Sequence, residues 1–267
     1  MKKTASLVIA MLLILGLLAG CAGGNAGSEQ TTWEKIQAEG KVVVGLDDTF
    51  APMGYREAGT NELVGFDIDM AAEMGERLGI EFVWQPTEWK GVTGSLNAKK
   101  FDLVINGMSI TEERKKEISF SIPYVNAGIG AVVLSSNGDI TDVEQLKDLS
   151  LATQTGSSGA EACKELGYEN ITYYDQYPQA FQDLSIGRVD AVIVDVTTAA
   201  HFMSMQPGEY SLLEDRLVEE DYAIGLRQDD KDLEEALNGV LKEMMEDGTL
   251  KAISEKWFGA DIVAYQE

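Results

Sequence analysis

Strand-like and helix-like segments alternate along almost the whole sequence, and this alternation limits the possible fold more than any other feature. Short apolar, β-branched runs such as 41–46 and 188–195 have the composition of buried strands. Segments between them, such as 68–78, carry apolar residues at helical spacing and end at a glycine, here Gly79. Strands joined through helices usually run parallel, so the pattern predicts an α/β fold with mainly parallel sheets flanked by helices.

The alternation occurs twice. It runs from residue 41 to about 105 and starts again at Ala131, so the chain has two α/β halves. The 267 residues are enough for one large domain or two of moderate size. In open α/β sheets, ligands bind outside the carboxyl ends of the strands. Polar residues directly after strands are therefore the candidates for a functional site.

The N-terminus has the pattern of an export signal. Lys2 and Lys3 precede an apolar run, 7–18, that is short for a membrane span. The following Leu-Ala-Gly-Cys, 18–21, resembles a bacterial lipobox. This resemblance implies a lipoprotein signal peptide over 1–20, a lipid on Cys21, a flexible tether over 21–32 and a place on the extracytoplasmic face of the cell membrane. The alternative is an ordinary signal peptide followed by a chance cysteine.

Charge and cysteine content exclude several classes of function. The formal net charge is −24, from 21 basic and 45 acidic residues, which is the wrong sign for a nucleic-acid partner. With Cys21 lipidated, Cys163 has no disulfide partner. His201 is the single histidine, and no second ligand stands at zinc-site spacing. We therefore expect neither a metal nor another cofactor.

A candidate anion site lies in residues 101–114, FDLVINGMSITEER. A predicted strand ends at Asn106-Gly107, Ser109 follows, and Thr111 is a suitable cap for a short helix that contains Arg114. Free hydroxyls, helix amides and an arginine would then meet, a combination that suits a carboxylate. Alternatively, Arg114 is one solvated charge in the mixed run 112–117.

The second half carries a matching pair of features. The loop 154–159, QTGSSG, opens a predicted helix and could donate amides and hydroxyls to an anion. It lacks the lysine and the longer spacing of a nucleotide-binding P-loop. Asp195 ends another predicted strand, either as a functional carboxylate or as a helix cap.

Together these motifs resemble the type II periplasmic-type solute-binding proteins of amino-acid ABC importers, in their lipoprotein form. The resemblance covers nearly all of residues 33–259. It implies two lobes, 33–125 plus 220–267 and 130–216, which are connected near 124–129 and 217–222 and close on an amino acid. The matching segments are LDDTFAPMGY (46–55), ELVGFDIDMAAEMGERLG (62–79), FDLVINGMSITEERKKEISFSIPY (101–124), GRVDAVIVD (187–195) and GTLKAISEKWFG (248–259).

The resemblance also implies roles for single residues. Arg114 and Ser109 would bind the ligand carboxylate together with the loop around Ser157 and Ser158, and Asp195 would bind its ammonium group. Phe50 and Trp89 would form an aromatic wall. The complete predicted set is Asp47, Phe50, Trp89, Asn106, Gly107, Ser109, Arg114, Gln154, Ser157, Ser158 and Asp195.

One departure from the family pattern bears on specificity. Some relatives carry paired hydroxyls where this chain has Asn106-Gly107, and Gly107 can contribute only its backbone. The ligand cannot be copied from those relatives. Acidic residues near the predicted cleft, Asp47, Asp48 and Glu88, favour a polar and cationic amino acid, with arginine or lysine ahead of glutamine and cystine.

The sequence thus predicts a monomeric, non-enzymatic receptor that passes an amino acid to ABC permease and ATPase subunits. Two alternatives remain open. Amino-acid-forming dehydratases share this fold, and carboxylate pairs such as Asp47-Asp48 could do acid–base chemistry. A ligand-sensing protein is the other, although this chain shows neither a membrane span beyond the signal nor a signalling domain.

Overall fold

The computed structural model describes residues 30–265. The predicted signal peptide (1–20), Cys21 and nearly all of the predicted tether (21–32) lie outside the described residues. The fold described below begins at Thr32.

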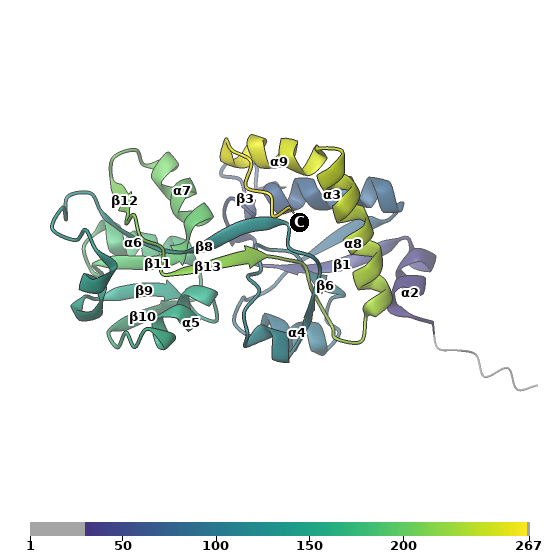
Figure 1. The fold of residues 1–267 in the computed structure, drawn as a ribbon, viewed down its shortest axis with the longest axis horizontal. Coiled ribbons are helices and arrows are strands. Elements are labelled where there is room, and N and C mark those ends of the chain that lie inside the picture. The colour runs from purple at the N-terminus through teal and green to yellow at the C-terminus, as the bar shows by residue number, and fades with distance from the viewer. Residues whose placement is uncertain (1–29, 266–267) are drawn as a thin grey trace, which may run out of the picture. The chain divides into compact units, whose positions relative to one another are not determined.

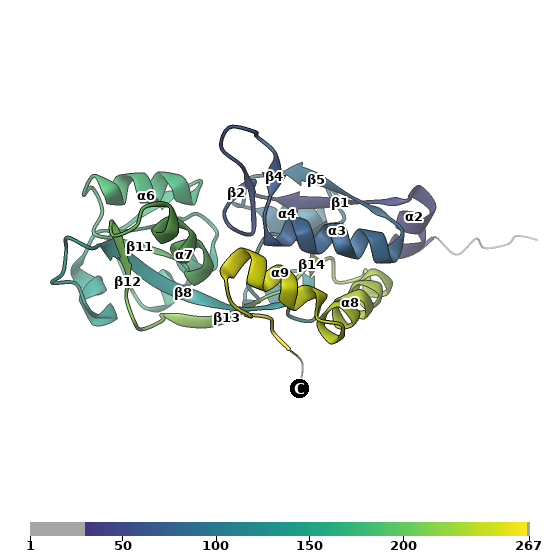
Figure 2. The ribbon, with the colours of Figure 1, turned by 90° about the horizontal axis from the view of Figure 1, so that it is seen from above.

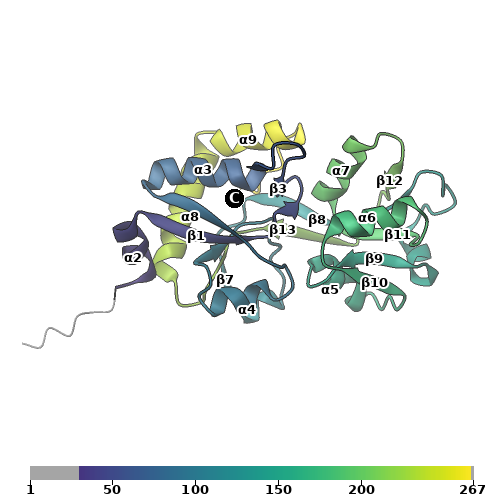
Figure 3. The same ribbon diagram turned by 180° about the vertical axis from the view of Figure 1, so that it is seen from behind.

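A five-stranded sheet organises the first part of the fold, which we call lobe 1 (Figure 1). Its strand order is β5-β1-β6-β14-β7, with β1 parallel to β5 and β6, and β14 antiparallel to β6 and β7. Helices α3 and α9 pack together on one side, whereas α4 lies near β6 (Figure 3). The elements are α2 (Thr32–Glu39), β1 (Lys41–Leu46), α3 (Phe66–Leu78), β5 (Glu81–Pro86), α4 (Val92–Asn97), β6 (Leu103–Val104), β7 (Ser119–Phe120), β14 (Gly225–Leu226), α8 (Lys231–Glu246) and α9 (Thr249–Phe258).

A small antiparallel sheet follows β1 within lobe 1. It contains β2 (Thr49–Phe50), β3 (Gly54–Arg56) and β4 (Leu63–Val64). It falls in the stretch after β1 that the sequence predicts as a loop. Its first strand carries Phe50, so the sheet places this aromatic ring at the carboxyl end of β1.

A six-stranded sheet organises the other part of the fold, which we call lobe 2. Strands β10, β9 and β11 run parallel, whereas β8 pairs antiparallel with β11, β12 and β13. Helices α6 and α7 lie together in the view from above (Figure 2). The elements are β8 (Val125–Leu134), the 3₁₀ helix η2 (Val143–Asp148), β9 (Leu151–Gln154), α5 (Ser158–Glu165), β10 (Ile171–Tyr174), α6 (Tyr177–Ser185), β11 (Ala191–Asp195), α7 (Val196–Met205), β12 (Tyr210–Leu212) and β13 (Val218–Tyr222).

Two long strands connect the lobes. β8 and β13 lie side by side along the connection, with Val218 opposite Ile129 and Tyr222 opposite Val125 (Figure 1). Beyond Tyr222 the chain continues into β14 of the first sheet. A paired ribbon of this kind can bend while both sheets keep their own hydrogen bonds.

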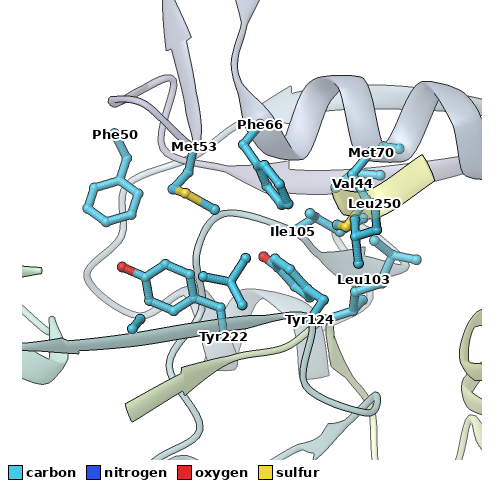
Figure 4. Close-up of a cluster of buried hydrophobic side chains, with 14 of the residues drawn as sticks. Val44, Phe50, Met53, Phe66, Met70, Leu103, Ile105, Tyr124, Tyr222 and Leu250 are labelled. Atoms are coloured by element: carbon cyan, nitrogen blue, oxygen red, sulfur yellow. The ribbon is translucent and has the colours of Figure 1, made fainter. Parts of the chain in front are cut away.

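Aromatic and aliphatic side chains fill the interior of lobe 1 (Figure 4). Phe66 of α3 stacks on Tyr124, with ring centroids 6.0 Å apart and planes 12° apart. Val44 and Leu103 reach this cluster from the sheet, and Met70 reaches it from α3. Helix α8 packs on the same core because its apolar residues follow helical spacing: Leu233, Leu237, Val240, Leu241 and Met244 are buried.

The predicted α/β class with helix-flanked sheets is confirmed, but both sheets are mixed. Strands β14 and β8 run antiparallel to their neighbours. Parallel pairing is therefore limited to β1 with β5 and β6, and to β9 with β10 and β11. The apolar stretch 222–226 is divided between β13 and β14. The acidic run 219–221 belongs to β13, where it pairs with residues 126–128 of β8. Among the described residues, no helix is long and apolar enough to cross a membrane.

Candidate functional site

A small cavity lies between the two lobes. Ten of the eleven predicted site residues line it. Asp47 lies just behind the cavity, and Tyr177 is an additional lining residue. The lining consists of Phe50, Trp89, Asn106, Gly107, Ser109 and Arg114 from lobe 1, and Gln154, Ser157, Ser158, Tyr177 and Asp195 from lobe 2.

Arg114 is the only lining residue with a fixed positive charge. Its side chain is buried, with 5% of the residue exposed, so the solvated-charge alternative is wrong. Nη1 donates to the Ser109 carbonyl oxygen at 2.9 Å, and Nη2 donates to the Gly156 carbonyl oxygen at 3.2 Å. The guanidinium carbon lies 5.4 Å from the centre of the Trp89 ring. These contacts orient the group without neutralising it, and its charge is left for a ligand.

The predicted capping helix at Thr111 is only a single turn. The structure has a three-residue 3₁₀ helix, Arg114–Lys116, and the Thr111 hydroxyl accepts from the Arg114 backbone N–H at 3.2 Å. The charge run 112–117 supports no longer helix because Ile118 turns back into the core at 2% exposure. Since one turn has almost no aligned dipole, the guanidinium itself must supply the positive potential here.

The turn at Asn106-Gly107 is held by buried hydrogen bonds. The Gly107 N–H donates to Asp67 Oδ2 at 2.7 Å, and the Asn106 side chain accepts from the Asp47 N–H at 2.8 Å. Gly107 has φ of 52°. Burial raises the pKa of Asp67 to about 7, although the nearby Tyr124 hydroxyl and the Gly107 N–H oppose the shift. Asp67 therefore fixes the shape of the cavity wall from behind.

We expect Gly107→Ala to destabilise the protein. A Cβ here would lie 2.8 Å from a Phe50 ring atom and 3.0 Å from Met53 Cγ, with φ in the left-handed region. Strain and overpacking should cost about 2–4 kcal/mol, a fall of roughly 4–16 °C in melting temperature. Gly138→Ala is the control, because a Cβ there meets no atom within 4 Å. Equal melting temperatures for the two variants would contradict this account.

The lobe-2 loop begins helix α5 and reaches across to lobe 1. Ser157 caps the helix, because its hydroxyl accepts from the Ala160 N–H at 3.1 Å. The Ser158 and Ser109 hydroxyl oxygens meet between the lobes at 3.1 Å. Gln154 Nε2 donates to Asp47 Oδ2 at 2.6 Å, a second bond between the lobes. These polar groups are close enough to hold one small molecule from both sides.

Asp195 lies at the end of β11 and is 3% exposed. It occupies the N-cap position of α7 but makes no side-chain capping bond, so the helix-cap alternative does not explain it. The Tyr222 hydroxyl donates to its Oδ1 at 2.7 Å. Burial, followed by the nearby Glu220 charge, raises the pKa of Asp195 to about 7. A cation in the cavity would stabilise its ionised form.

Further acidic residues lie close to Asp47. Burial raises the pKa of Asp47, and hydrogen bonds from Thr49 and Gln154 partly offset this effect. A second hollow adjoins Trp89 on this side, and its wall contains acidic residues but no lysine or arginine. It is lined by Asp47, Asp48, Pro86, Thr87, Glu88, Trp89, Asp175 and Gln176. This arrangement suits a positively charged side chain.

Sequence reasoning missed Tyr177 and Glu220. Tyr177 begins α6, and its ring centroid is 6.0 Å from that of Phe50. The sequence places the helix start near Ala180, whereas Pro178 in the first turn is the signal that indicates the true start. Glu220 faces Ser109 and Ser158, and only the folded connection between the lobes brings it there.

The remaining reactive residues lie apart from the cavity. In residues 30–265, no cluster of three or more histidine, cysteine, aspartate or glutamate residues could hold a metal ion. His201 packs against Tyr55 with ring centroids 5.3 Å apart, and burial lowers its pKa. Cys163 is a buried free thiol whose pKa burial raises to about 12. Neither residue contributes to the site.

Two α/β lobes joined by paired strands, with a buried cation and a buried carboxylate facing one cavity, define a two-lobed solute-binding protein of the type II fold. Residues 42–260 match the bacterial extracellular solute-binding proteins, family 3. The chain belongs to this family, which confirms the family resemblance found in the sequence, whereas the lipoprotein form stays a prediction.

Similar proteins bind different amino acids. The L-cystine-binding protein TcyJ of Escherichia coli (strain K12) is 32% identical over 96% of this chain and 94% of its own length. A substrate-binding protein from Streptococcus pneumoniae with bound histidine has a TM-score of 0.83 at 30% identity, covering 87% of this chain and 98% of that one. The protein Tv2483 bound to L-arginine has a TM-score of 0.81 at 30% identity, covering 87% and 96%.

Proposed function

We propose that this chain is an extracytoplasmic receptor that captures an amino acid between its lobes and delivers it to the permease and ATPase subunits of an ABC importer. The observation that carries the proposal is the placement of Arg114 and Asp195. The two groups are buried, belong to different lobes and line the same cavity. A zwitterion supplies the carboxylate for one and the ammonium group for the other.

Binding by this route favours lobe closure. Arg114 and Ser109 contact the ligand carboxylate from lobe 1, while Ser157, Ser158 and the loop amides contact it from lobe 2. Asp195 holds the ammonium group. The ligand therefore makes its full set of contacts only when the lobes are together, and this difference in contacts shifts the equilibrium towards the closed state. In this proposal, 33–125 plus 220–267 and 130–216 move as the two units.

The ligand side chain extends past Trp89 towards the acidic hollow. Asp48, Glu88 and Asp175 line that hollow without a basic residue, so a guanidinium or ammonium group is favoured there. Trp89 offers a further cation–π surface. We therefore propose arginine or lysine as the ligand, ahead of glutamine and cystine, and a relative bound to L-arginine supports this choice.

Anchoring to the membrane through a lipid on Cys21 forms part of the same proposal. The support is the sequence pattern at 18–21 and the extracellular character of the family. A lipid on the receptor would keep it close to its permease. Cys21→Ser should release the protein from the membrane fraction, and mass spectrometry of the mature N-terminus checks the modification.

A thermal-shift screen across the amino acids tests the proposed ligand. Because a ligand that binds only the folded protein stabilises it by mass action, a 100-fold excess over Kd contributes about 2.7 kcal/mol. For a protein of this size that is an increase of roughly 5–10 °C in melting temperature. We expect L-arginine or L-lysine to give the largest increase. No increase with any amino acid would contradict the proposed function.

The same samples distinguish a receptor from an enzyme. A similar structure at 34% identity and TM-score 0.80 is AncCDT-1, described as a precursor of cyclohexadienyl dehydratase, so turnover has to be tested. We expect the bound amino acid to be recovered unchanged by mass spectrometry. Conversion of the ligand would favour the enzyme.

A further inference from the structure

Glu220 is a carboxylate behind the anion-binding groups of the cavity, and no step of the proposed binding uses it. It belongs to β13, where it pairs with Ala127 of β8. The segment around Ser109 runs beside the same strand: Ser109 pairs with Tyr222, and the Ile110 N–H donates to the Asp221 carbonyl oxygen at 3.0 Å. The connection between the lobes thus positions Glu220 directly beside the site.

The contacts of Glu220 coincide with the groups that the ligand carboxylate needs. The hydroxyls of Ser109 and Ser158 face its carboxylate, and the Arg114 charge acts on it. Among the described residues, its Oε2 is buried without a hydrogen-bond partner. An ionised carboxylate accepts hydrogen bonds but cannot donate them, so it draws the serine hydroxyl protons towards itself.

Ionised Glu220 and a ligand carboxylate therefore compete. Each serine hydroxyl has one proton to donate, and a proton directed to Glu220 is not available to the ligand. Two carboxylates near one arginine also repel each other, and such a pair relieves the repulsion by taking up a proton. The number of available donors and the charge repulsion therefore both disfavour binding of a ligand carboxylate while Glu220 is ionised.

We propose that Glu220 is a positioning residue that takes up a proton when an amino-acid carboxylate binds at Arg114. As a neutral acid, it releases the hydroxyls of Ser109 and Ser158 to donate to the ligand, and it can itself donate to a serine oxygen. As a carboxylate, it competes with the ligand for these hydroxyl protons. This inference rests on the proposed function, because it requires a carboxylate ligand.

Other charged groups act on the same residue. The negative charge of Glu161 on α5 raises the pKa of Glu220, and the positive charge of Arg114 lowers it. The charge of Glu220 in turn raises the pKa of Asp195. Burial raises the pKa of Glu220. The ligand carboxylate raises it further, so affinity falls as the pH rises through the pKa of Glu220 in the complex. Asp195 has the opposite effect, because the ligand ammonium group favours its ionised form and affinity falls as the pH decreases.

Glu220→Gln separates the two effects, since glutamine keeps the size and can donate to the serine oxygens. Calorimetry with L-arginine, L-lysine, L-histidine and L-cystine, at pH 5.5–8.5 and in buffers of different ionisation enthalpy, gives both Kd and the number of protons taken up. The wild type should lose affinity on both sides of an optimum, by at most about tenfold per pH unit for one linked proton. The variant should keep only the acidic loss, bind about tenfold more tightly at pH 8 and take up fewer protons.

Glu219→Gln is the matched control, because this neighbour on β13 is exposed and pairs with Arg216 at 2.6 Å. It removes the same charge and should behave as the wild type. Identical proton numbers and pH profiles in the wild type and Glu220→Gln would overturn the role of Glu220 while leaving the proposed function intact. Failure of every amino acid to bind the wild type would contradict the proposed function itself. If Glu220→Gln does not fold, wild-type binding near pH 8 without proton uptake is sufficient to overturn the inference.

Discussion

Replacing Arg114 with alanine is expected to weaken amino-acid binding by two to four orders of magnitude. The guanidinium makes two bonds to main-chain carbonyl oxygens but keeps its charge, and a ligand carboxylate would take the charge-assisted bonds. Two such bonds contribute about 3–6 kcal/mol, and each 1.4 kcal/mol is a factor of ten in Kd. Calorimetry with the best ligand of the thermal-shift screen measures the loss.

The stability of the ligand-free protein should change little in the same variant. One bond of Arg114, to Gly156, connects the two lobes, so its loss does not expose the core of either lobe. Arg114→Lys is informative because it keeps the charge but cannot grip a carboxylate with a planar fork, and we expect an intermediate affinity. Arg188→Ala is the control for loss of charge, because Arg188 pairs with Asp183 at the surface of lobe 2. Wild-type affinity in Arg114→Ala would show that the carboxylate binds elsewhere.

The sequence predicted most of the fold because its strands are short, apolar and bounded by glycine. The residue limits of β1, 41–46, were predicted without error. The direction of strand pairing was harder to predict from the sequence. Strands β14 and β8 pair antiparallel because the chain crosses between the lobes before each of them pairs, and no local pattern records these crossings. The acidic run 219–221 illustrates the difficulty. Its acidic composition does not indicate a strand, yet pairing with β8 makes it part of β13.

The candidate site was predictable to the extent that its residues follow strands directly. Ser109, Ser157 and Asp195 do so, and all three line the cavity. Residues that support the cavity wall without lining it have no sequence motif that indicates this role. Asp67 supports Gly107 across 40 positions of sequence, and Glu220 reaches Ser109 only through the folded connection. Such contacts are set by the tertiary packing and not by the motif.

Replacing Asp195 with asparagine is expected to abolish tight binding while stabilising the ligand-free protein above pH 7. Asparagine can still accept the Tyr222 hydroxyl bond of 2.7 Å, but it cannot pair with an ammonium group. Loss of one buried charge pair should weaken binding by about two to three orders of magnitude. Wild-type affinity in this variant would show that Asp195 does not hold the ammonium group.

The stability effect follows from the pKa of Asp195, which the fold raises from 3.8 to about 7. Between these values the unfolded chain is ionised while the folded protein keeps its proton, so the unfolded state binds fewer protons. Wild-type stability therefore falls as the pH rises from about 4 to 7 and then levels off. Asp67 contributes in the same direction and remains in the variant.

Melting curves of the ligand-free proteins at pH 5 and pH 8 measure this effect. At pH 5 Asp195→Asn should already melt somewhat higher, because Asp195 is ionised in the unfolded wild type while it keeps its proton in the folded protein. At pH 8 this difference should be larger by roughly 5–11 °C, because the variant no longer buries a charge and the two pH units from 5 to the folded pKa of about 7 correspond to about 2.7 kcal/mol. An equal difference at both values would contradict the raised pKa. A difference that grows with pH, together with lost affinity, would mean that the receptor keeps a destabilising carboxylate because its ligand needs a buried negative charge.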